Sequence, residues 1–253
     1  MSLDIGSALQ SGVDDLLSER GALFVAAFVL FGLVNAVVTQ SLTVAFYRRL
    51  FAALPGDAQA REQAMQAVSE QAGLAVDVPL AGAVAGVLVL FLVTELLRVV
   101  AIRAFASGAA APLPSTVTRD FGSTALTAVL AAVVTVGALL IGSVLFVIPG
   151  IVVAVLFTFV RQEVALNDSG VLDAVRNSVG LVSDALLPVT GLVVVLFVLG
   201  IVVTLPLQFL PVTLPPALTT VVTTVLGQVV AVFGIAVVTD AYRQVTADPH
   251  EDW

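Results

Sequence analysis

The stretch that decides the fold is residues 123–160, STALTAVLAAVVTVGALLIGSVLFVIPGIVVAVLFTFV, which carries no charged side chain. As one helix it would be about 57 Å long at the usual rise per residue, about twice the hydrocarbon thickness of a bilayer. The stretch must therefore fold back, and Ile148-Pro149-Gly150 favours a turn. We expect a tight helical hairpin, with membrane spans at residues 123–147 and 149–166.

The composition of the whole chain also indicates that lipid surrounds it. Hydrophobic residues make up 59% of the 253 residues and charged residues 11%, whereas a soluble domain is about half apolar and about a quarter charged. The apolar runs are continuous, so they lack the alternation that an outer-membrane barrel requires. Helices satisfy their backbone hydrogen bonds internally in lipid. The sequence therefore predicts an all-α integral membrane protein.

The charged residues are unusual in kind. All ten basic residues are arginine, and the net charge is -8. Depletion of lysine with excess carboxylate is typical of solvation in a salt-rich cytoplasm, where a Debye length of about 3 Å screens acidic repulsion, and we expect an extreme halophile. The acidic balance argues against a nucleic-acid partner and against a polybasic lipid-binding patch. With no cysteine and one histidine, His250, we expect no metal site and no cofactor.

Six apolar spans emerge from a pass along the chain, within one polytopic domain over residues 1–253. The second, fourth and sixth spans each begin at a proline, where the missing N–H costs nothing. This punctuation indicates three helical hairpins, either as a true internal repeat or as the ordinary spacing of a six-span protein. The expected spans are about 21–46, 79–103, 123–147, 149–166, 185–206 and 216–238, and the prolines are Pro79, Pro149 and Pro216.

Short amphipathic segments accompany the spans. Residues 1–20 predict a helix lying in the membrane interface, since its apolar residues are spaced for one face: Leu3, Ile5, Leu9, Val13, Leu16 and Leu17. Val171 to Val182 predicts a second such helix, in which Asp173 and Arg176 stand at an i, i+3 pairing distance. Its expected apolar side holds Val171, Leu172, Val175, Val179 and Val182.

The distribution of arginines predicts the topology. With six spans, seven arginines fall on one side of the membrane and three, all within residues 47–78, on the other. The side richer in arginine faces the cytoplasm, so we expect both termini there, residues 47–78 outside, and a flexible tail over residues 240–253. Within the outer loop, Asp57 is expected to cap a helix over residues 58–72. The first twenty residues lack the basic start of a signal peptide.

One part of the chain resembles a known group of proteins. It comprises Ile141-Gly-Ser-Val-Leu-Phe-Val-Ile-Pro-Gly-Ile151, residues 157–165, and an amphipathic helix with Leu172-Asp-Ala-Val-Arg-Asn-Ser178. It resembles the membrane domain attached to some glycerophosphoryl diester phosphodiesterases, and related stand-alone multi-span proteins of halophilic archaea. In the fused enzymes the chemistry lies in a separate soluble domain, absent here. The resemblance implies a fold and no catalytic residue.

Few polar side chains fall within the spans. Glu95 and Arg98 lie one turn apart, and they are either a functional ionisable pair or an interfacial ion pair whose long side chains extend towards water. Arg161 and Glu163 either pair with the amphipathic helices or form a head-group or anion site. Asn35 and Gln228, near the middle of their spans, either bond between helices or line a polar cavity.

No catalytic constellation is visible, so function rests on these alternatives. We favour a non-enzymatic membrane protein that organises the membrane or interacts with lipid or with other membrane proteins. A small transporter is the second hypothesis and requires Asn35 and Gln228 to share a water-filled cavity. A membrane-embedded enzyme acting on lipid is the third, and it requires Glu95, Arg98 and Arg161 to meet in one pocket.

Overall fold

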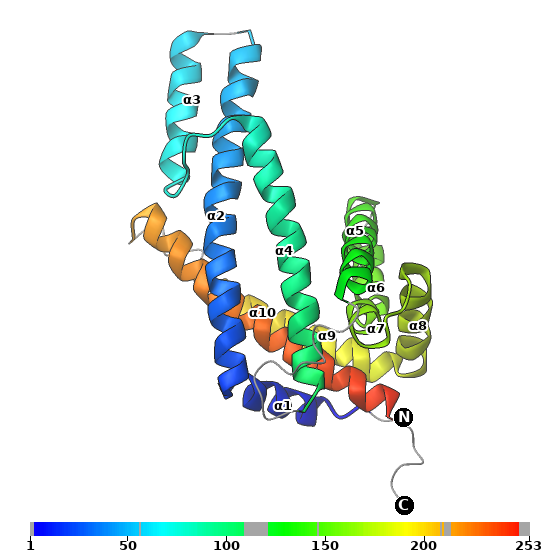
Figure 1. Ribbon diagram of the computed structural model, residues 1–253. Helices are drawn as coiled ribbons and strands as arrows, with labels where there is room; N and C mark the ends of the chain where they lie inside the picture. The colour runs from blue at the N-terminus through cyan, green and yellow to red at the C-terminus, as the bar shows by residue number, and fades with distance from the viewer. Residues whose placement is uncertain are drawn as a thin grey trace, which may run out of the picture. The chain divides into compact units, whose positions relative to one another are not determined.

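The structure is a computed structural model, and it describes residues 3–55, 57–108, 121–145, 147–207, 209 and 214–247 (Figure 1). The described residues form helices and no strand, which confirms the all-helical class. His250, the end of the expected tail, and the connector around Arg119 lie outside the described residues. The helices are α1 (Ile5–Leu17), α2 (Glu19–Ala53), α3 (Ala58–Gln71), α4 (Leu80–Ala106), α5 (Phe121–Leu145), α6 (Val147–Leu156), α7 (Val160–Asn167), α8 (Val171–Asp184), α9 (Leu186–Thr204) and α10 (Pro216–Thr246).

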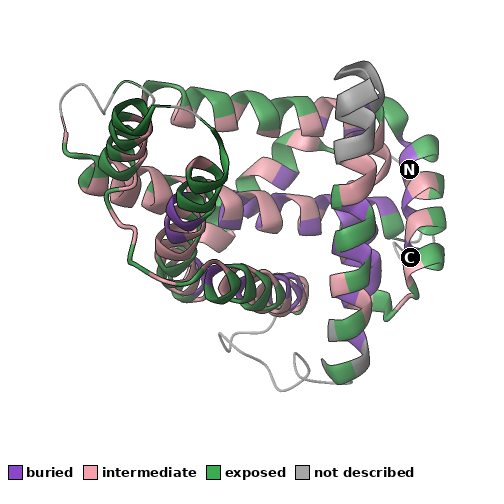
Figure 2. Cartoon of the chain, turned by 90° about the horizontal axis from the view of Figure 1, so that it is seen from above, coloured by how far each residue is buried: buried purple, intermediate pink, exposed green. Residues whose placement is uncertain are grey.

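Within the described residues, five segments are long and apolar enough to cross a membrane. They are α2, α4, residues Gly150–Asn167, α9 and α10, while α5 contributes a shorter apolar stretch over Leu126–Leu139. The most apolar window of α9 has a mean hydropathy of 2.9, yet only 11% of it is buried within the protein. Exposed residues cover much of the long helices (Figure 2). Such surfaces are compatible with lipid as the surrounding solvent, because exposing this much apolar surface to water is unfavourable.

The chain forms two compact units. The first comprises Met1–Val25, Glu95–Leu199 and Ala231–Trp253, and the second comprises Ala26–Thr94 and Gly200–Val230. The single polytopic domain stays a prediction, and so does the six-span hairpin arrangement. The first unit holds every buried glutamate of the described residues, so it is the unit that positions the candidate site.

The core of the first unit forms where α1, α9 and α10 meet. Leu3 and Ala8 of the α1 region pack with Val189 and Leu192 of α9 and with Val237 of α10, all nearly inaccessible. Helix α1 begins at a capped end, because the Asp4 side chain accepts a hydrogen bond from the backbone N–H of Ser7 at 3.0 Å. Such a cap satisfies one of the free donors of a helix start. The expected amphipathic helix is therefore present.

The residues that α1 buries most fully within the protein are small, and two of the apolar residues expected on its interfacial side stay exposed. Val13 and Leu17 are 44% and 80% exposed, whereas Ala8 and Gly12 are buried. A Cβ atom at Gly12 would lie 2.3 Å from a methyl group of Val237, so α1 crosses α10 in very close contact. Small residues, rather than leucines, make such an approach possible. The exposed Val13 and Leu17 remain compatible with the predicted interfacial side of α1, whereas the hydrophobic pattern alone did not indicate the close contact at Gly12.

Two glycine substitutions test the crossing. We expect Gly12→Ala to destabilise the protein by about 1–3 kcal/mol, because the added methyl group overpacks the contact with Val237. Gly180→Ala in α8 is the matched control, since a Cβ there has no neighbour within 4 Å. It should stabilise the protein by up to about 1 kcal/mol through helix propensity. Thermal unfolding in detergent, followed by circular dichroism, measures both; equal shifts for the two variants would disprove the close crossing.

The helix is interrupted within the segment where a span is expected, residues 149–166. Helix α6 ends at Leu156 and α7 begins at Val160, with a turn between them. The Ser178 hydroxyl of α8 bridges the interruption: it donates to the Leu156 carbonyl at 2.8 Å and accepts from the Phe159 N–H at 3.2 Å. Backbone groups inside lipid need such partners. The segment Gly150–Asn167, which contains this interruption, is still long and apolar enough to cross a membrane, in agreement with the span expected over residues 149–166.

Elements around this interruption pack closely. Helix α5 contacts α6, α7 and α8. Residue 146, between the printed ends of α5 and α6, lies outside the described residues, so the turn expected at residues 148–150 stays a prediction. In α8 the buried positions are Ala174, Ser178 and Val182, whereas the expected Leu172 is 72% exposed.

The second unit is held by polar contacts between its own helices. The Gln40 amide donates to the Thr220 hydroxyl at 3.0 Å and accepts from the Leu74 N–H at 2.8 Å. Ser41 accepts from the Val76 N–H at 2.9 Å. Helix α3 has the expected cap, since Asp57 accepts from the Gln59 N–H at 3.0 Å. These bonds join α2 both to α10 and to the segment that follows α3.

Candidate functional site

Two arginines share one buried carboxylate in the first unit. Glu95 of α4 is 2% exposed; its Oε1 accepts from Arg98, one turn further along, and its Oε2 accepts from the Arg161 Nε of α7 at 3.3 Å. The two arginine side chains are 34% and 37% exposed. Sequence spacing indicated the first pair, but the Glu95 carboxylate is buried instead of extending to water. The Arg161 partner is also new, because α7 and α4 are far apart in the chain.

The three side chains converge on one pocket, as the hypothesis of a lipid enzyme requires. That pocket has a volume of about 10 Å³, and apolar residues form its other walls: Val99, Ile102, Ala128, Ala131 and Val164. Such a volume suits about one water molecule. The pocket therefore has no room for a lipid ester or for any substrate of comparable size.

Glu163 is the centre of a second buried cluster. Its Oε1 accepts from the Tyr242 hydroxyl at 2.7 Å, and the side chain is 3% exposed. Its Oε2 accepts from Asn177 at 3.0 Å, Ser169 at 3.2 Å and Asn167 at 3.3 Å. All of these donors are neutral. Hydrogen bonds to the charged form can hold a carboxylate without a cation.

This cluster joins three helices and tests whether Glu163 and Arg161 contact the amphipathic helices. Asn177 lies on amphipathic α8 and Tyr242 on α10, so the predicted contact between Glu163 and an amphipathic helix is confirmed. The same expectation was wrong for Arg161, which contacts Glu95 of α4. The Tyr242 ring also packs edge-on against Phe159 at a centroid distance of 5.7 Å. Tyr242 thus ties the end of α10 to the start of α7.

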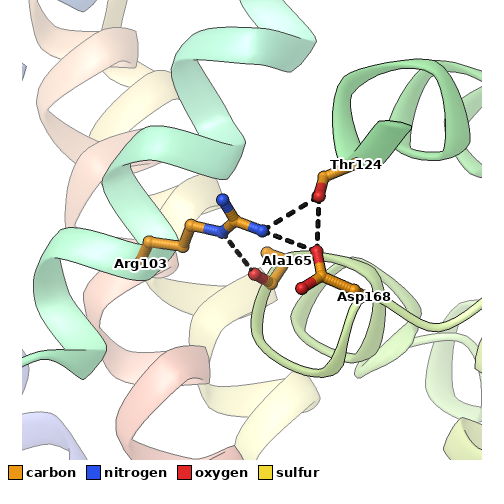
Figure 3. Close-up of polar contacts among 4 residues, drawn as sticks. All are labelled: Arg103, Thr124, Ala165 and Asp168. Atoms are coloured by element: carbon orange, nitrogen blue, oxygen red, sulfur yellow. Dashed lines mark hydrogen bonds and ion pairs between the residues drawn. The ribbon is translucent and has the colours of Figure 1, made fainter. Parts of the chain in front are cut away.

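A third cluster forms around Arg103, whose side chain is 9% exposed (Figure 3). Its Nε donates to the Ala165 carbonyl at 2.6 Å, and its Nη2 donates to Thr124 at 3.0 Å and Asp168 at 2.7 Å. Thr124 in turn donates to Asp168. Asp168 has a φ of 52° and follows the last residue of α7. Arg103 therefore closes the carboxyl end of α7, a role that no local sequence signal indicated.

The two mid-span amides stand apart from these clusters. Asn35 of α2 is exposed, and Gln228 of α10 lies against Gly32, with its amide nitrogen 2.8 Å from where a Cβ would be. Gln228 is thus packed between helices, as the expectation of interhelical contact requires. Tight packing of Gln228 offers no support for a polar track through the second unit.

An open pocket of about 500 Å³ lies beside α1 and is lined by side chains of both signs. Within it, burial raises the pKa of Asp15 above its ordinary value of 3.8; Arg20 and Arg243 act in the opposite direction, and Asp240 and Asp14 add to the rise. Among the described residues, no group of three or more acidic or histidine side chains could hold a metal ion. The charged side chains of both signs are therefore the main chemical feature of this pocket.

The raised pKa of Asp15 predicts a pH dependence. Folded protein holds the Asp15 proton more tightly than unfolded protein, so this carboxyl destabilises the fold as pH rises from below 3.8 through the folded pKa. We expect Asp15→Asn to raise the melting temperature at pH 7 and to have little effect below pH 3.8, where both states are protonated. Glu62→Gln, at an exposed carboxyl of α3 that does not affect Asp15, is the control. An Asp15→Asn shift that is the same at both pH values would contradict this assignment.

Comparison with known proteins gives one family. The family described as a domain of unknown function (DUF7847) matches residues 3–245. Neither the curated proteins nor the solved structures include a match to the chain. Because the family match covers nearly all of the helical chain described above, this protein belongs to the DUF7847 family.

Proposed function

We propose that this protein is a non-enzymatic multi-pass membrane protein that acts by contact with lipid or with other membrane proteins. The observation that carries the proposal is the use of its buried charges. Both oxygens of Glu95 are occupied by arginines, and both oxygens of Glu163 are occupied by neutral donors. A general acid or base must reach a substrate proton. These carboxylates instead join helices, and what remains exposed is an apolar surface.

The exposed apolar side chains support contact with lipid. On α9, Leu187, Phe197 and Val202 are 85%, 66% and 63% exposed. On the amphipathic helices, Leu17 of α1 and Leu172 of α8 are 80% and 72% exposed. Helices with an apolar outer side and a polar remainder lie in the membrane interface. Both classes of surface favour lipid as the main partner.

Six spans and cytoplasmic termini remain part of the proposal. Helix α5 has 25 residues and contacts α6 and α7, so it is the natural sixth span beside the five long apolar segments. With α5 in the membrane, both termini lie on the side that receives most arginines. A salt-rich cytoplasm, indicated by the absence of lysine, completes the expected setting.

Reconstitution tests the proposed function. Purified protein in vesicles loaded with a fluorescent dye and with small ions should leave their leakage rates unchanged, and the lipids should stay chemically intact by mass spectrometry. Solute flux above that of empty vesicles would instead support the transporter, and time-dependent lipid products would support an enzyme. Tags at the two ends should be accessible from the same side. Tags on opposite sides would reject the sixth span.

A further inference from the structure

Charge is not balanced in the cluster of Glu95, Arg98 and Arg161. Two guanidinium groups share one carboxylate, which leaves a formal excess of one positive charge. In the described part of the chain, these three are the only charged residues that line the pocket. The cluster uses two of the ten arginines of a chain whose net charge is -8. A positive excess here runs against the charge of the whole molecule.

The excess is placed at a depth where it needs a partner. Arg98 lies five residues before Arg103 on α4, so at the usual rise it is about 8 Å farther from the carboxyl end of the helix. Arg103 lies in the last turn of α4, which ends at Ala106, and pairs with Asp168, which is 47% exposed. One and a half turns further in, an unbalanced guanidinium meets apolar surroundings, where a charge without a counter-ion is costly.

The exposed sides of the two guanidiniums offer the donors for that partner. Arg98 bonds Glu95 through Nη1 and Arg161 bonds it through Nε, so further N–H groups of both side chains are available on their exposed parts. Each guanidinium has five N–H donors in a rigid fork that matches a phosphate group. The enclosed pocket of about 10 Å³ is too small for phosphate, so an anion can approach only from the outer side.

We propose that Arg98 and Arg161 together bind a phosphate group at the membrane interface, carried by an anionic lipid head group. Glu95 holds the two guanidiniums beside one another, so that both face the same anion. The inference rests on the proposed function, because it names the lipid chemistry that the protein contacts. Long arginine side chains reach head groups while their carbon stems stay among apolar residues.

The rival explanation is a purely structural ion triad that joins α4 to α7. It predicts that removing the arginines changes stability and leaves lipid preference untouched. A phosphate site predicts a selective loss of anionic lipid binding. The two explanations therefore differ in a binding measurement made on folded protein.

The experiment uses the full chain in detergent micelles with tail-labelled phosphatidylglycerol, and fluorescence anisotropy reports the dissociation constant. For Arg98→Gln/Arg161→Gln we expect binding weakened at least about tenfold, since charge-assisted bonds to phosphate are lost. Arg48→Gln/Arg176→Gln is the matched control: it removes the same charge from two exposed arginines, each paired with one aspartate. The control should stay within about twofold of the unaltered chain, and an equal loss in both double variants would overturn the proposal.

A further variant guards against unfolding. Arg98→Gln/Arg161→Gln leaves Glu95 buried without a cation, which can cost stability. Glu95→Gln/Arg98→Gln/Arg161→Gln neutralises the whole cluster, and its elution as a single species in detergent shows that it is folded. If the triple variant is folded and its affinity for phosphatidylglycerol is unchanged, the proposal is overturned.

Competition identifies the source of the phosphate. Inorganic phosphate at millimolar concentration should not displace phosphatidylglycerol if the lipid is the ligand, and phosphatidylcholine, which has no net charge, should bind more weakly. Complete displacement by inorganic phosphate would retain the phosphate site and reject the lipid as its ligand. These outcomes are separate from the vesicle assays, in which flux or lipid turnover rejects the proposed function whatever the arginine variants do.

Discussion

Replacing Glu163 with alanine should cost on the order of 2–4 kcal/mol, chiefly because the buried Tyr242 hydroxyl loses its acceptor. An unsatisfied buried polar group costs about 1–3 kcal/mol, and the new cavity adds to that. Asn167 and Asn177 are exposed and can donate to water instead, so their lost bonds add less. The variant should unfold at a much lower temperature in detergent, or fail to elute as a single species. Circular dichroism against temperature measures the shift.

Two further variants make that result specific. Glu163→Gln keeps one acceptor oxygen, so its loss should be smaller than that of Glu163→Ala. Glu70→Ala is the control, because Glu70 of α3 is exposed and accepts one bond from Gln66; exposed changes of this kind stay within about 0.5 kcal/mol. If Glu163→Ala melted like Glu70→Ala, the cluster would not hold α7, α8 and α10 together.

A double-mutant cycle assigns part of the effect to Tyr242. Tyr242→Phe removes only the hydroxyl that donates to Oε1 at 2.7 Å. In the unaltered chain this change leaves an acceptor unpaired, whereas in the Glu163→Ala background it removes a donor that already lacks its partner. The Tyr242→Phe cost should therefore be smaller in that background. Equal costs in both backgrounds would mean that the two residues act independently.

The all-helical class could be predicted because long uncharged runs allow few other structures. Uncharged runs of sufficient length require helices, and Asp57 shows that local cap chemistry can also be read directly. The positions at which α1 and α8 pack against the protein could not be predicted, because Gly12 and Ser178 contact residues that lie far away in the sequence. Hydrophobic spacing favoured Leu17 and Leu172, and both are exposed. In a membrane interface, an apolar side chain gains as much from lipid as from the protein core.

The candidate site could be predicted only where its partners are local. Glu95 and Arg98 lie three residues apart, so helix geometry places them together. Arg161 joins them from 66 residues away through the packing of α7. Arg103 gave no signal as a partner of Asp168, because an arginine at a helix end has an ordinary explanation in the membrane interface. Long-range pairing of charges was the information that a single sequence lacked.

Arg103→Met should be the second strongly destabilising change, by about 2–4 kcal/mol, because the side chain is 9% exposed and a hydrogen bond that involves a charged group contributes about 1.5–3 kcal/mol. Methionine keeps the unbranched stem and loses the donors to Ala165, Thr124 and Asp168 (Figure 3). The ion pair itself contributes only a part, because Asp168 is 47% exposed and solvent screens it. Most of the effect should come from the Ala165 carbonyl at the end of α7.

That division of the energy can be measured at Asp168. Asp168→Asn removes the charge but keeps an acceptor, and asparagine tolerates the φ of 52° at this position, so its cost should be about 1 kcal/mol or less. Arg176→Met, on an exposed arginine, should change the melting temperature little. If Asp168→Asn instead matched Arg103→Met, the ion pair would dominate, and raising the salt concentration should then destabilise the unaltered chain. If the carbonyl bond dominates, added salt should leave the Arg103→Met penalty nearly unchanged, because a buried N–H···O=C contact is scarcely screened.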